Sequence, residues 1–441
     1  MSNQKTKKPI KPLKVALVCD WLISIGGAER VLKSIQSLYP DAPIYTSQYR
    51  PSRIDWFKDT EVKTGWLNYF PTWTRYIIGP LRQFYFNHLD LSDYDLIISV
   101  TGAEAKSVLT QRGTNGKKAL HICYCHVPTQ YYWGKYEDYL KNPGFGFLNP
   151  IMRLGLKLLV APARLADLKA AARPDFYLTD SHYAAAEIKK YYNREATVLN
   201  PPVSVEIFQQ SVENSKTKIG NCQEKKSTNQ TTKNQKSQTE KSEQPSQPNS
   251  TPVENSQSSV RFSPPLSPEQ LAATSPYFIN FSRQVSWKRL DLAIKACLKT
   301  KQHLVLIGDG PLHPELVSLA QNSPLIHFFP PMTQPELKNY LRFAKAFIFP
   351  SEEPFGIAPV EAIAAGCPVL AFSRGGAQDY LIPGKNGLFF DRQSVNSLVE
   401  TIEKFNQLTP LSPTKVSDSA TKFSESHFKF TLQDFIDEKL Q

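Results

Sequence analysis

Two glutamates, Glu353 and Glu361, stand eight positions apart, and a glycine-containing loop lies between them. Gly356 allows close approach of the backbone, and the amides of Phe355, Gly356 and Ile357 at the start of a helix suit an anionic ligand such as a diphosphate. An ionised carboxylate accepts hydrogen bonds from vicinal hydroxyl groups and distinguishes their positions. The stretch therefore indicates a site for a ligand that carries both a diphosphate and a polyol.

A short succession of elements positions these residues. The apolar residues 346–349 predict a buried strand, helix-forming residues follow the loop as far as Gly366, and a second apolar strand begins at Pro368. This order is a β-loop-α-β unit of a parallel sheet. Because ligands bind beyond the carboxyl ends of parallel strands, we expect the residues from Glu353 to Ile357 to line a crevice.

The segment Glu-Pro-Phe-Gly-Ile-Ala-Pro-Val-Glu, from Glu353 to Glu361, resembles the E-x7-E signature of the large glycosyltransferase family called group 1 or family 4. Two glutamates at this spacing are more often solvated residues of an amphipathic helix, but the flanking Pro-Phe-Gly and Ala-Ala-Gly-Cys-Pro-Val weaken that alternative. The resemblance implies an α/β fold of the GT-B type, with two facing Rossmann-like domains and an interdomain cleft. It also implies a retaining hexosyltransferase that uses a nucleotide-sugar donor, with no cofactor and no metal.

Length, charge and cysteine usage are compatible with such an enzyme. A chain of 441 residues exceeds the size of a single core, which predicts two domains. The net charge of +12 favours anionic partners, and because no nucleic-acid-binding motif accompanies it, we expect nucleotide-sugar phosphates and an anionic membrane surface instead of nucleic acid. The six cysteines form no C-x-x-C pair, which is typical of a reducing cytoplasm.

The amino-terminal residues and the hydropathy pattern bear on localisation. Residues 1–14 carry five lysines without an apolar segment, and no apolar run approaches the length of a membrane span. We therefore expect neither a signal peptide nor a membrane span, and a cytoplasmic protein that can lie peripherally at the inner face of the membrane.

Composition and resemblance together divide the chain. Residues 1–208 are predicted to form an acceptor-side Rossmann-like domain, and residues 276–425 the nucleotide-sugar-binding domain. Residues 209–275 are rich in Ser, Gln, Asn, Thr, Lys and Pro and cannot bury enough apolar surface to offset their ordering entropy, so we expect a disordered linker. Residues 426–441 are expected, by analogy, to form a helix that crosses back to the first domain.

Two motifs of the first half follow predicted strands. Gly26 and Gly27, after the strand 15–20, form a flexible turn whose amides can approach a phosphate, and they resemble the glycine loop of the family. His126 follows the strand 119–125 and resembles the His-x-Pro motif of the family, although Gln130 replaces the usual Arg and Gly134 the usual Asp. We expect His126 to contact the transferred sugar from the opposite domain and to stabilise a cationic sugar centre.

In the second half, Arg283 and Lys288 lie between the strand 277–281 and the following helix, which places two cations beside a phosphate-binding position. They resemble the diphosphate-binding Arg and Lys of the family. The resemblance further implies that Glu361 holds the ribose hydroxyls and that Glu353 holds the hydroxyls of the donor sugar. The donor site is therefore predicted to lie between His126 of the first domain and the residues Arg283, Lys288, Glu353 and Glu361 of the second domain.

Donor and acceptor remain open at this point. The Tyr and Trp that follow His-x-Pro resemble the mannosyltransferase-like branch, which favours GDP-mannose, and a UDP-hexose is the alternative. The aromatic, basic stretches 66–86 and 145–168 suit a membrane interface and a lipid-linked or polysaccharide acceptor, or else a packed helical hairpin and a buried interdomain helix. A nucleotide-sugar epimerase and a non-catalytic nucleotide-sugar binder are the competing functions.

Overall fold

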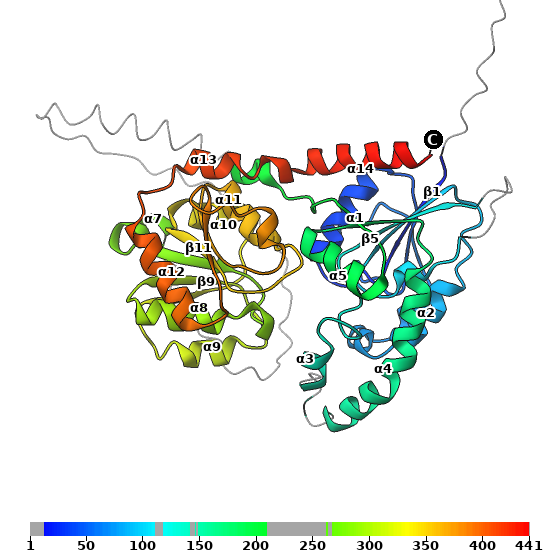
Figure 1. The fold of residues 1–441 in the computed structure, drawn as a ribbon, viewed down its shortest axis with the longest axis horizontal. Helices are drawn as coiled ribbons and strands as arrows, with labels where there is room; N and C mark the ends of the chain where they lie inside the picture. The colour runs from blue at the N-terminus through cyan, green and yellow to red at the C-terminus, as the bar shows by residue number, and fades with distance from the viewer. Residues whose placement is uncertain are drawn as a thin grey trace, which may run out of the picture.

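The computed structural model describes residues 13–110, 118–141, 146, 149–209, 262 and 267–440. Within them the chain forms two domains, each built on a parallel β-sheet with helices against its faces, and the two domains lie side by side (Figure 1). This is the expected α/β architecture.

The sheet of the first domain has the order β3-β2-β1-β4-β5-β6-β7, and every strand pair is parallel. Its central strands are continuous apolar runs because helices cover both faces of the sheet. The strands are β1 (Val15–Cys19), β2 (Ile44–Thr46), β3 (Val62–Thr64), β4 (Leu96–Thr101), β5 (Leu120–Cys125), β6 (Phe176–Thr179) and β7 (Thr197–Val198).

The sheet of the second domain has the order β10-β9-β8-β11-β12-β13, again with parallel pairs throughout. Buried apolar residues on each of its faces form a separate core cluster. The strands are β8 (Tyr277–Phe281), β9 (His303–Ile307), β10 (Ile326–Phe329), β11 (Ala346–Phe349), β12 (Val369–Phe372) and β13 (Gly387–Phe390).

Helices connect the strands of each sheet. Those of the first domain are α1 (Gly27–Leu38), α2 (Gly79–Asn87), α3 (Tyr136–Lys141), α4 (Asn149–Ala171) and α5 (His182–Tyr192), with the 3-10 helices η1 (Trp66–Tyr69), η2 (Thr72–Tyr76) and η3 (Ala105–Ser107). Those of the second domain are α7 (Pro268–Thr274), α8 (Leu290–Lys299), α9 (His313–Leu319), α10 (Gln334–Phe343), α11 (Ile357–Ala364), α12 (Val395–Gln407) and α13 (Pro413–Asp418), with η5 (Ser286–Lys288), η6 (Gly376–Asp379) and η7 (Thr421–Phe423).

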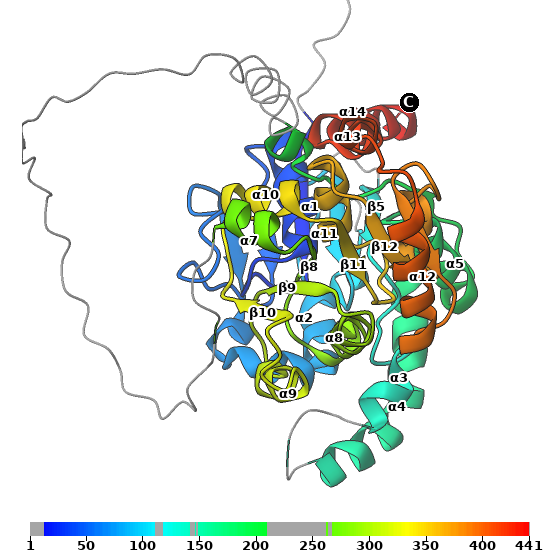
Figure 2. The same cartoon turned by 90° about the vertical axis from the view of Figure 1, so that its left-hand side faces the viewer.

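Helices α3 and α4 project from the body of the first domain (Figures 1 and 2). The sequence left open a buried interdomain helix for this stretch, and that alternative is wrong, because Leu154, Leu158 and Leu165 are each more than half exposed. Pro162 lies inside α4, and the helix continues through it to Ala171. The aromatic stretch 66–86 is partly buried and partly exposed. Leu67 and Phe86 are buried, whereas Trp66 and Trp73 are exposed.

Part of the segment 209–275, predicted as a disordered linker, is ordered. Residues 268–274 form α7, which begins with a capping box between Ser267 and Gln270 and buries Leu271 in the core of the second domain. The prediction is wrong for this stretch because an average over composition does not register a short, capped helix that buries one leucine. Residues 210–261 lie outside the described residues.

Helix α14 (Glu425–Leu440) ends the described chain and lies along the first domain (Figure 1). Phe428, Leu432 and Ile436, four residues apart on one face, are buried in the core cluster that also contains β1 and α1. Ser34 of α1 donates to Glu425 at 3.0 Å. The last helix of the chain therefore completes the core of the first domain.

We predict that Leu432→Ala destabilises the first domain by about 2–5 kcal/mol, because it leaves a cavity between α14, α1 and the sheet. Phe430→Ala is the matched control, since Phe430 lies on the same helix and is 73% exposed. Urea unfolding followed by circular dichroism measures both. Equal, small effects of the two substitutions would contradict the packing role of α14.

Candidate active site

A cavity of about 480 Å³ lies between the two domains, at the carboxyl ends of the strands. Most of the predicted site residues line it together. From the first domain these are Gly26, Gly27 and His126, and from the second domain Lys288, Glu353, Phe355, Gly356, Ile357 and Glu361. Arg283 lies in the loop after β8 but is not among the described residues that line this cavity.

The loop before α11 requires glycine at one position. Gly356 has φ of 89°, and a Cβ there would lie 2.7 Å from Cζ of Phe349. Because side chains rarely adopt this conformation and the space is filled, only glycine fits without rearrangement. The residues that start α11 line the cavity. Across it, a Cβ on Gly27 would contact Ile357 at 3.4 Å, so the two predicted loops face each other.

Both glutamates of the E-x7-E segment are paired with cations. Nζ of Lys288 lies 2.6 Å from Oε1 of Glu353, which also accepts a hydrogen bond from Ser351 at 2.6 Å. Oε1 of Glu361 lies 2.7 Å from Nη1 of Arg30, a residue of α1 in the opposite domain. The sequence did not predict Arg30, and its one signal was its place four residues after the glycine turn.

His126 is held by a carboxylate that the sequence did not assign to the site. Its Nδ1 lies 2.9 and 3.0 Å from the two carboxylate oxygens of Asp180, which follows β6. Its Nε2 is buried and has no hydrogen-bond partner within the part of the chain that the structure describes. The one signal for Asp180 was its place directly after the run Phe-Tyr-Leu-Thr at residues 176–179.

The charge state of His126 follows from these contacts. Burial lowers the pKa of His126, but the Asp180 carboxylate, with smaller contributions from Glu29 and Asp20, raises it by more, so the net pKa lies above the ordinary value of 6.5. The site therefore favours the imidazolium form, in which both ring nitrogens carry a proton.

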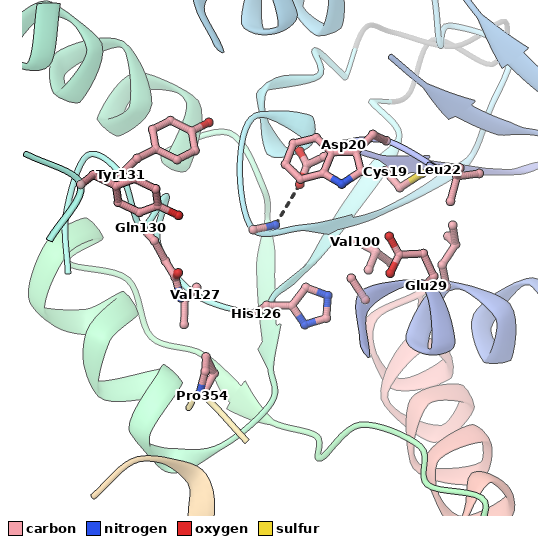
Figure 3. A pocket seen from close by; sticks show the side chains of 15 residues that line it. Cys19, Asp20, Leu22, Glu29, Val100, His126, Val127, Gln130, Tyr131 and Pro354 are labelled. Carbon is pink, nitrogen blue, oxygen red and sulfur yellow. Dashed lines mark hydrogen bonds between the residues drawn. The ribbon is translucent and has the colours of Figure 1, made fainter. Parts of the chain in front are cut away.

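A second cavity of about 340 Å³ lies against the first domain and shares His126 with the interdomain cavity (Figure 3). Asp20 stands on its wall but is engaged with the backbone, since it accepts hydrogen bonds from the amides of Gly102, Ala103 and Ala105. The cavity wall also includes Trp21, Leu22, Ala28, Glu29, Leu32, Val100, Val127, Gln130, Tyr131, Tyr139 and Pro354. Asp20 thus shapes the loop after β4.

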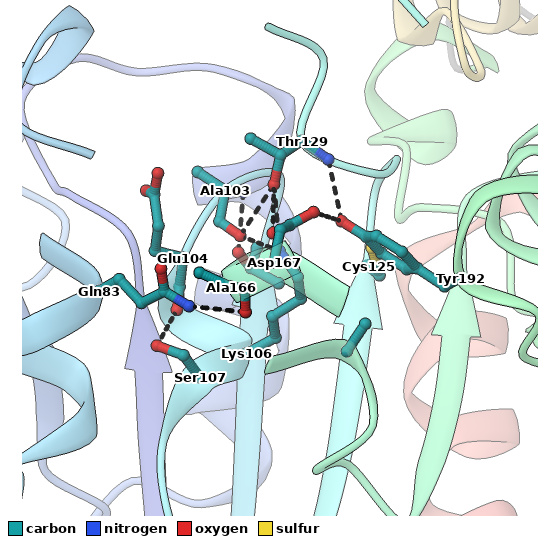
Figure 4. Close-up of polar contacts among 12 residues, drawn as sticks. Gln83, Ala103, Glu104, Lys106, Ser107, Cys125, Thr129, Ala166, Asp167 and Tyr192 are labelled. Carbon is teal, nitrogen blue, oxygen red and sulfur yellow. Dashed lines mark hydrogen bonds and ion pairs between the residues drawn. The ribbon is translucent and has the colours of Figure 1, made fainter. Parts of the chain in front are cut away.

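A buried polar cluster supports the loop that follows His126 (Figure 4). Asp167 of α4 pairs with Lys106 at 2.7 Å and accepts hydrogen bonds from Thr129, Trp133 and Tyr192 at 2.8–3.0 Å. Because Lys106, Thr129 and Tyr192 are themselves buried, the His-x-Pro loop is tied to the carboxyl-terminal part of α4. The predicted aromatic residues after His126 are therefore structural as well as close to the site.

The structure also bears on metal binding and on the cysteines. Among the described residues, no group of three or more His, Cys, Asp or Glu side chains is arranged to hold a metal ion. Cys19, Cys123, Cys125, Cys297 and Cys367 are buried free thiols.

Comparison with known proteins finds a family model that matches the second domain. Residues 266–423 match the family described as glycosyl transferases group 1. A 151-residue segment is 32% identical to the D-inositol 3-phosphate glycosyltransferase of Mycolicibacterium smegmatis, covering 32% of this chain and 35% of that protein. The match thus spans about a third of this curated relative. These likenesses support a glycosyltransferase.

Solved structures resemble the whole chain in fold. HepE of Anabaena in complex with UDP has a TM-score of 0.62 at 16% identity, covering 97% of this chain and 100% of that one. Sucrose-phosphate synthase of Thermosynechococcus elongatus has a TM-score of 0.62 at 15% identity, covering 97% of this chain and 99% of that one. At these identities the likeness concerns the fold alone, and the fold is the GT-B arrangement of two Rossmann-like domains.

We predict that Asp180→Asn lowers the pKa of His126, because the carboxylate that favours the imidazolium is removed while burial remains. Proton NMR titration of the imidazole, assigned with His126→Gln, measures this. His121 is the internal control, because burial lowers its pKa to about 3 and it stays neutral in both proteins. An unchanged His126 titration would contradict the pairing.

The same pair links stability to pH. Because the pKa of His126 is raised on folding, its contribution to the free energy of unfolding is complete below the ordinary value of 6.5 and is lost as pH rises through the folded-state pKa. Asp180→Asn should weaken this loss of stability with rising pH, because it removes the main cause that raises the pKa of His126, and urea unfolding at a series of pH values measures it.

Proposed function

We propose that the protein is a retaining glycosyltransferase that moves a hexose from a nucleotide sugar to an acceptor. The match of residues 266–423 to the group 1 glycosyltransferase family and the GT-B arrangement of the two domains support this proposal. The observation that carries the proposal is the interdomain cavity, where Lys288, the start of α11 and two glutamates face His126. Such a cavity offers an anion site beside hydroxyl-binding carboxylates, as a nucleotide sugar needs.

In this proposal the second domain binds the donor. Lys288 and the amides from Phe355 to Ile357 neutralise the diphosphate as it leaves. Arg283 lies outside the cavity wall, in the loop after β8, and would have to reach the diphosphate from there. Glu353 accepts hydrogen bonds from the hydroxyls of the donor sugar, and Glu361 from those of the ribose. In the structure Lys288 lies 2.6 Å from Glu353, and both residues line the cavity. A bound diphosphate carries more negative charge than Glu353, so it can draw the Lys288 ammonium away from this carboxylate.

The role of His126 differs from the sequence-based expectation. An imidazolium repels a cationic sugar centre, so the raised pKa of His126 does not suit direct stabilisation of such a centre. Its buried Nε2–H instead suits donation to an oxygen of the transferred sugar or of the departing diphosphate. In a retaining reaction the acceptor then attacks from the face that the diphosphate leaves, and its proton passes to the departing phosphate.

The donor remains a choice between two classes. The residues after His126 favour GDP-mannose by resemblance, and we take it as the leading donor. A UDP-hexose is the second candidate, because the structurally similar HepE of Anabaena is described in complex with UDP-glucose.

The acceptor is proposed to enter through the cavity on the first domain, which shares His126 with the donor site. A lipid-linked or polysaccharide acceptor suits its mixed wall, where aromatic rings stand beside the carboxylate of Glu29. The first domain also carries the projecting helix α4 (Figure 2).

Helix α4 has the character of an interfacial helix. Five of its six large exposed apolar residues share one face and form a leucine stripe, defined as Ile151, Leu154, Leu158, Leu165 and Leu168, which are 38–68% exposed. Leu159 is also exposed, at 59%, but lies off this face. Arg153, Lys157 and Lys169 are exposed on the same helix, whose single acid, Asp167, is buried and paired. No described helix is long and apolar enough to cross a bilayer. We propose that the stripe rests in an anionic membrane surface.

The donor site is tested by thermal shift against GDP-mannose and UDP-glucose. We expect one of these donors to stabilise the wild type and Lys288→Ala to lose most of that stabilisation, because a cation facing the diphosphate is removed. Lys295→Ala, an exposed lysine of α8, is the control and should behave as wild type. The absence of any donor-induced shift in the wild type counts against the proposed donor class.

The membrane surface is tested by co-sedimentation with phosphatidylcholine vesicles that contain or lack phosphatidylglycerol. We expect binding to the anionic vesicles, weakened by salt and lost in the variant Leu154→Gln/Leu158→Gln/Leu165→Gln. The control variant Ile382→Gln/Leu408→Gln/Phe430→Gln changes exposed apolar residues elsewhere and should bind normally. A dimeric wild type that becomes monomeric when the stripe is made polar would show instead that a second copy covers it.

A further inference from the structure

The carboxylate proposed to bind ribose is shared between the two domains. Glu361 is 3% exposed, and its Oε1 accepts hydrogen bonds from Arg30 of α1 at 2.7 Å and from Gln334 of α10 at 3.2 Å. Arg30 lies 331 positions earlier in the chain. A buried carboxylate is strongly destabilised without such partners, so Arg30 holds Glu361 in place from the opposite side of the cavity.

The second oxygen of this carboxylate is left for a ligand. Within the described residues, Oε2 of Glu361 has no hydrogen-bond partner, and both Glu361 and Arg30 line the interdomain cavity. An ionised carboxylate can accept about four hydrogen bonds over its two oxygens. Two vicinal hydroxyl groups can therefore bind Glu361 while Arg30 stays in contact with Oε1.

We propose that Arg30 is a positioning residue for the ribose of the nucleotide: it fixes Glu361 through Oε1 so that Oε2 faces the 2′- and 3′-hydroxyls. The proposal rests on the proposed function, in which Glu361 binds ribose. Recognition of the nucleotide then requires a residue from each domain, because the second domain supplies the carboxylate and the first domain supplies the cation that orients it.

Two simpler roles for Arg30 lead to different expectations. If Arg30 only held the domains together, its loss would weaken every ligand of the cleft alike. Other contacts already join the domains near this cavity, since Tyr183 donates to Glu352 at 3.1 Å and His182 contacts Asp379 at 3.1 Å. If Arg30 acted on the diphosphate, its loss would weaken all nucleoside diphosphates equally. Neither role depends on the ribose hydroxyls.

The ribose hydroxyls themselves therefore provide the test. Isothermal titration calorimetry compares GDP with 2′,3′-dideoxy-GDP, and UDP with 2′,3′-dideoxy-UDP, on the wild type and on Arg30→Gln. We expect Arg30→Gln to weaken the normal nucleotide by about tenfold, as for a lost hydrogen bond to a charged group, and to leave the dideoxy nucleotide unchanged. Lys33→Gln removes an exposed cation from the same helix and should alter neither.

A second variant separates positioning from general packing. Glu361→Gln should weaken the normal nucleotide selectively, and adding Arg30→Gln to it should cause little further loss, because the two residues act as a unit. Parallel weakening of both nucleotides, or unchanged binding of the normal nucleotide by Arg30→Gln, overturns the role of Arg30. If neither GDP nor UDP binds the wild type, the nucleotide-sugar function itself is contradicted. Dideoxy nucleotide binding also reports that each variant is folded.

Discussion

A carboxylate removed from water needs a cation or several hydrogen-bond donors, and this requirement organises the cleft. Asp20, Asp180 and Glu361 are all buried at the carboxyl ends of strands or just beyond them. Each is satisfied differently: Asp20 by backbone amides, Asp180 by the imidazole of His126 and Glu361 by Arg30. Asp20 therefore fixes the loop after β4, Asp180 favours the charged form of the His126 ring, and Glu361 forms an ion pair between the two domains.

The same requirement explains the rigid support behind the site. Lys106 and Asp167 form a buried ion pair at 2.7 Å, and Arg82 and Glu104 form another at 2.6 Å. Buried pairs of this kind add little net stability, but removing one partner leaves a charge without compensation. They therefore hold the loops after β4 and β5 in one arrangement, on which the position of His126 depends.

The features predicted correctly from the sequence are those that local residue patterns determine. Apolar runs marked the strands, and glycines and the E-x7-E spacing marked the loops at their carboxyl ends, so most of the cavity wall was found. Pairs made by folding were missed, because nothing local connects Arg30 to Glu361 or His126 to Asp180. The sequence also did not decide whether α4 is exposed or buried. An amphipathic pattern shows that a helix has an apolar face, but it does not show what covers that face.

The pairing of Arg30 with Glu361 also affects the cost of binding. A carboxylate free to rotate loses side-chain entropy when a ligand orders it, and that loss reduces affinity. Glu361 is ordered beforehand by Arg30 and Gln334, so in the proposed reaction the ribose meets an acceptor already in position. Because Arg30 comes from the other domain, its share of this order exists only while the domains are together. The pair of Arg30 and Glu361 then contributes both to donor recognition and to the contact between the two domains.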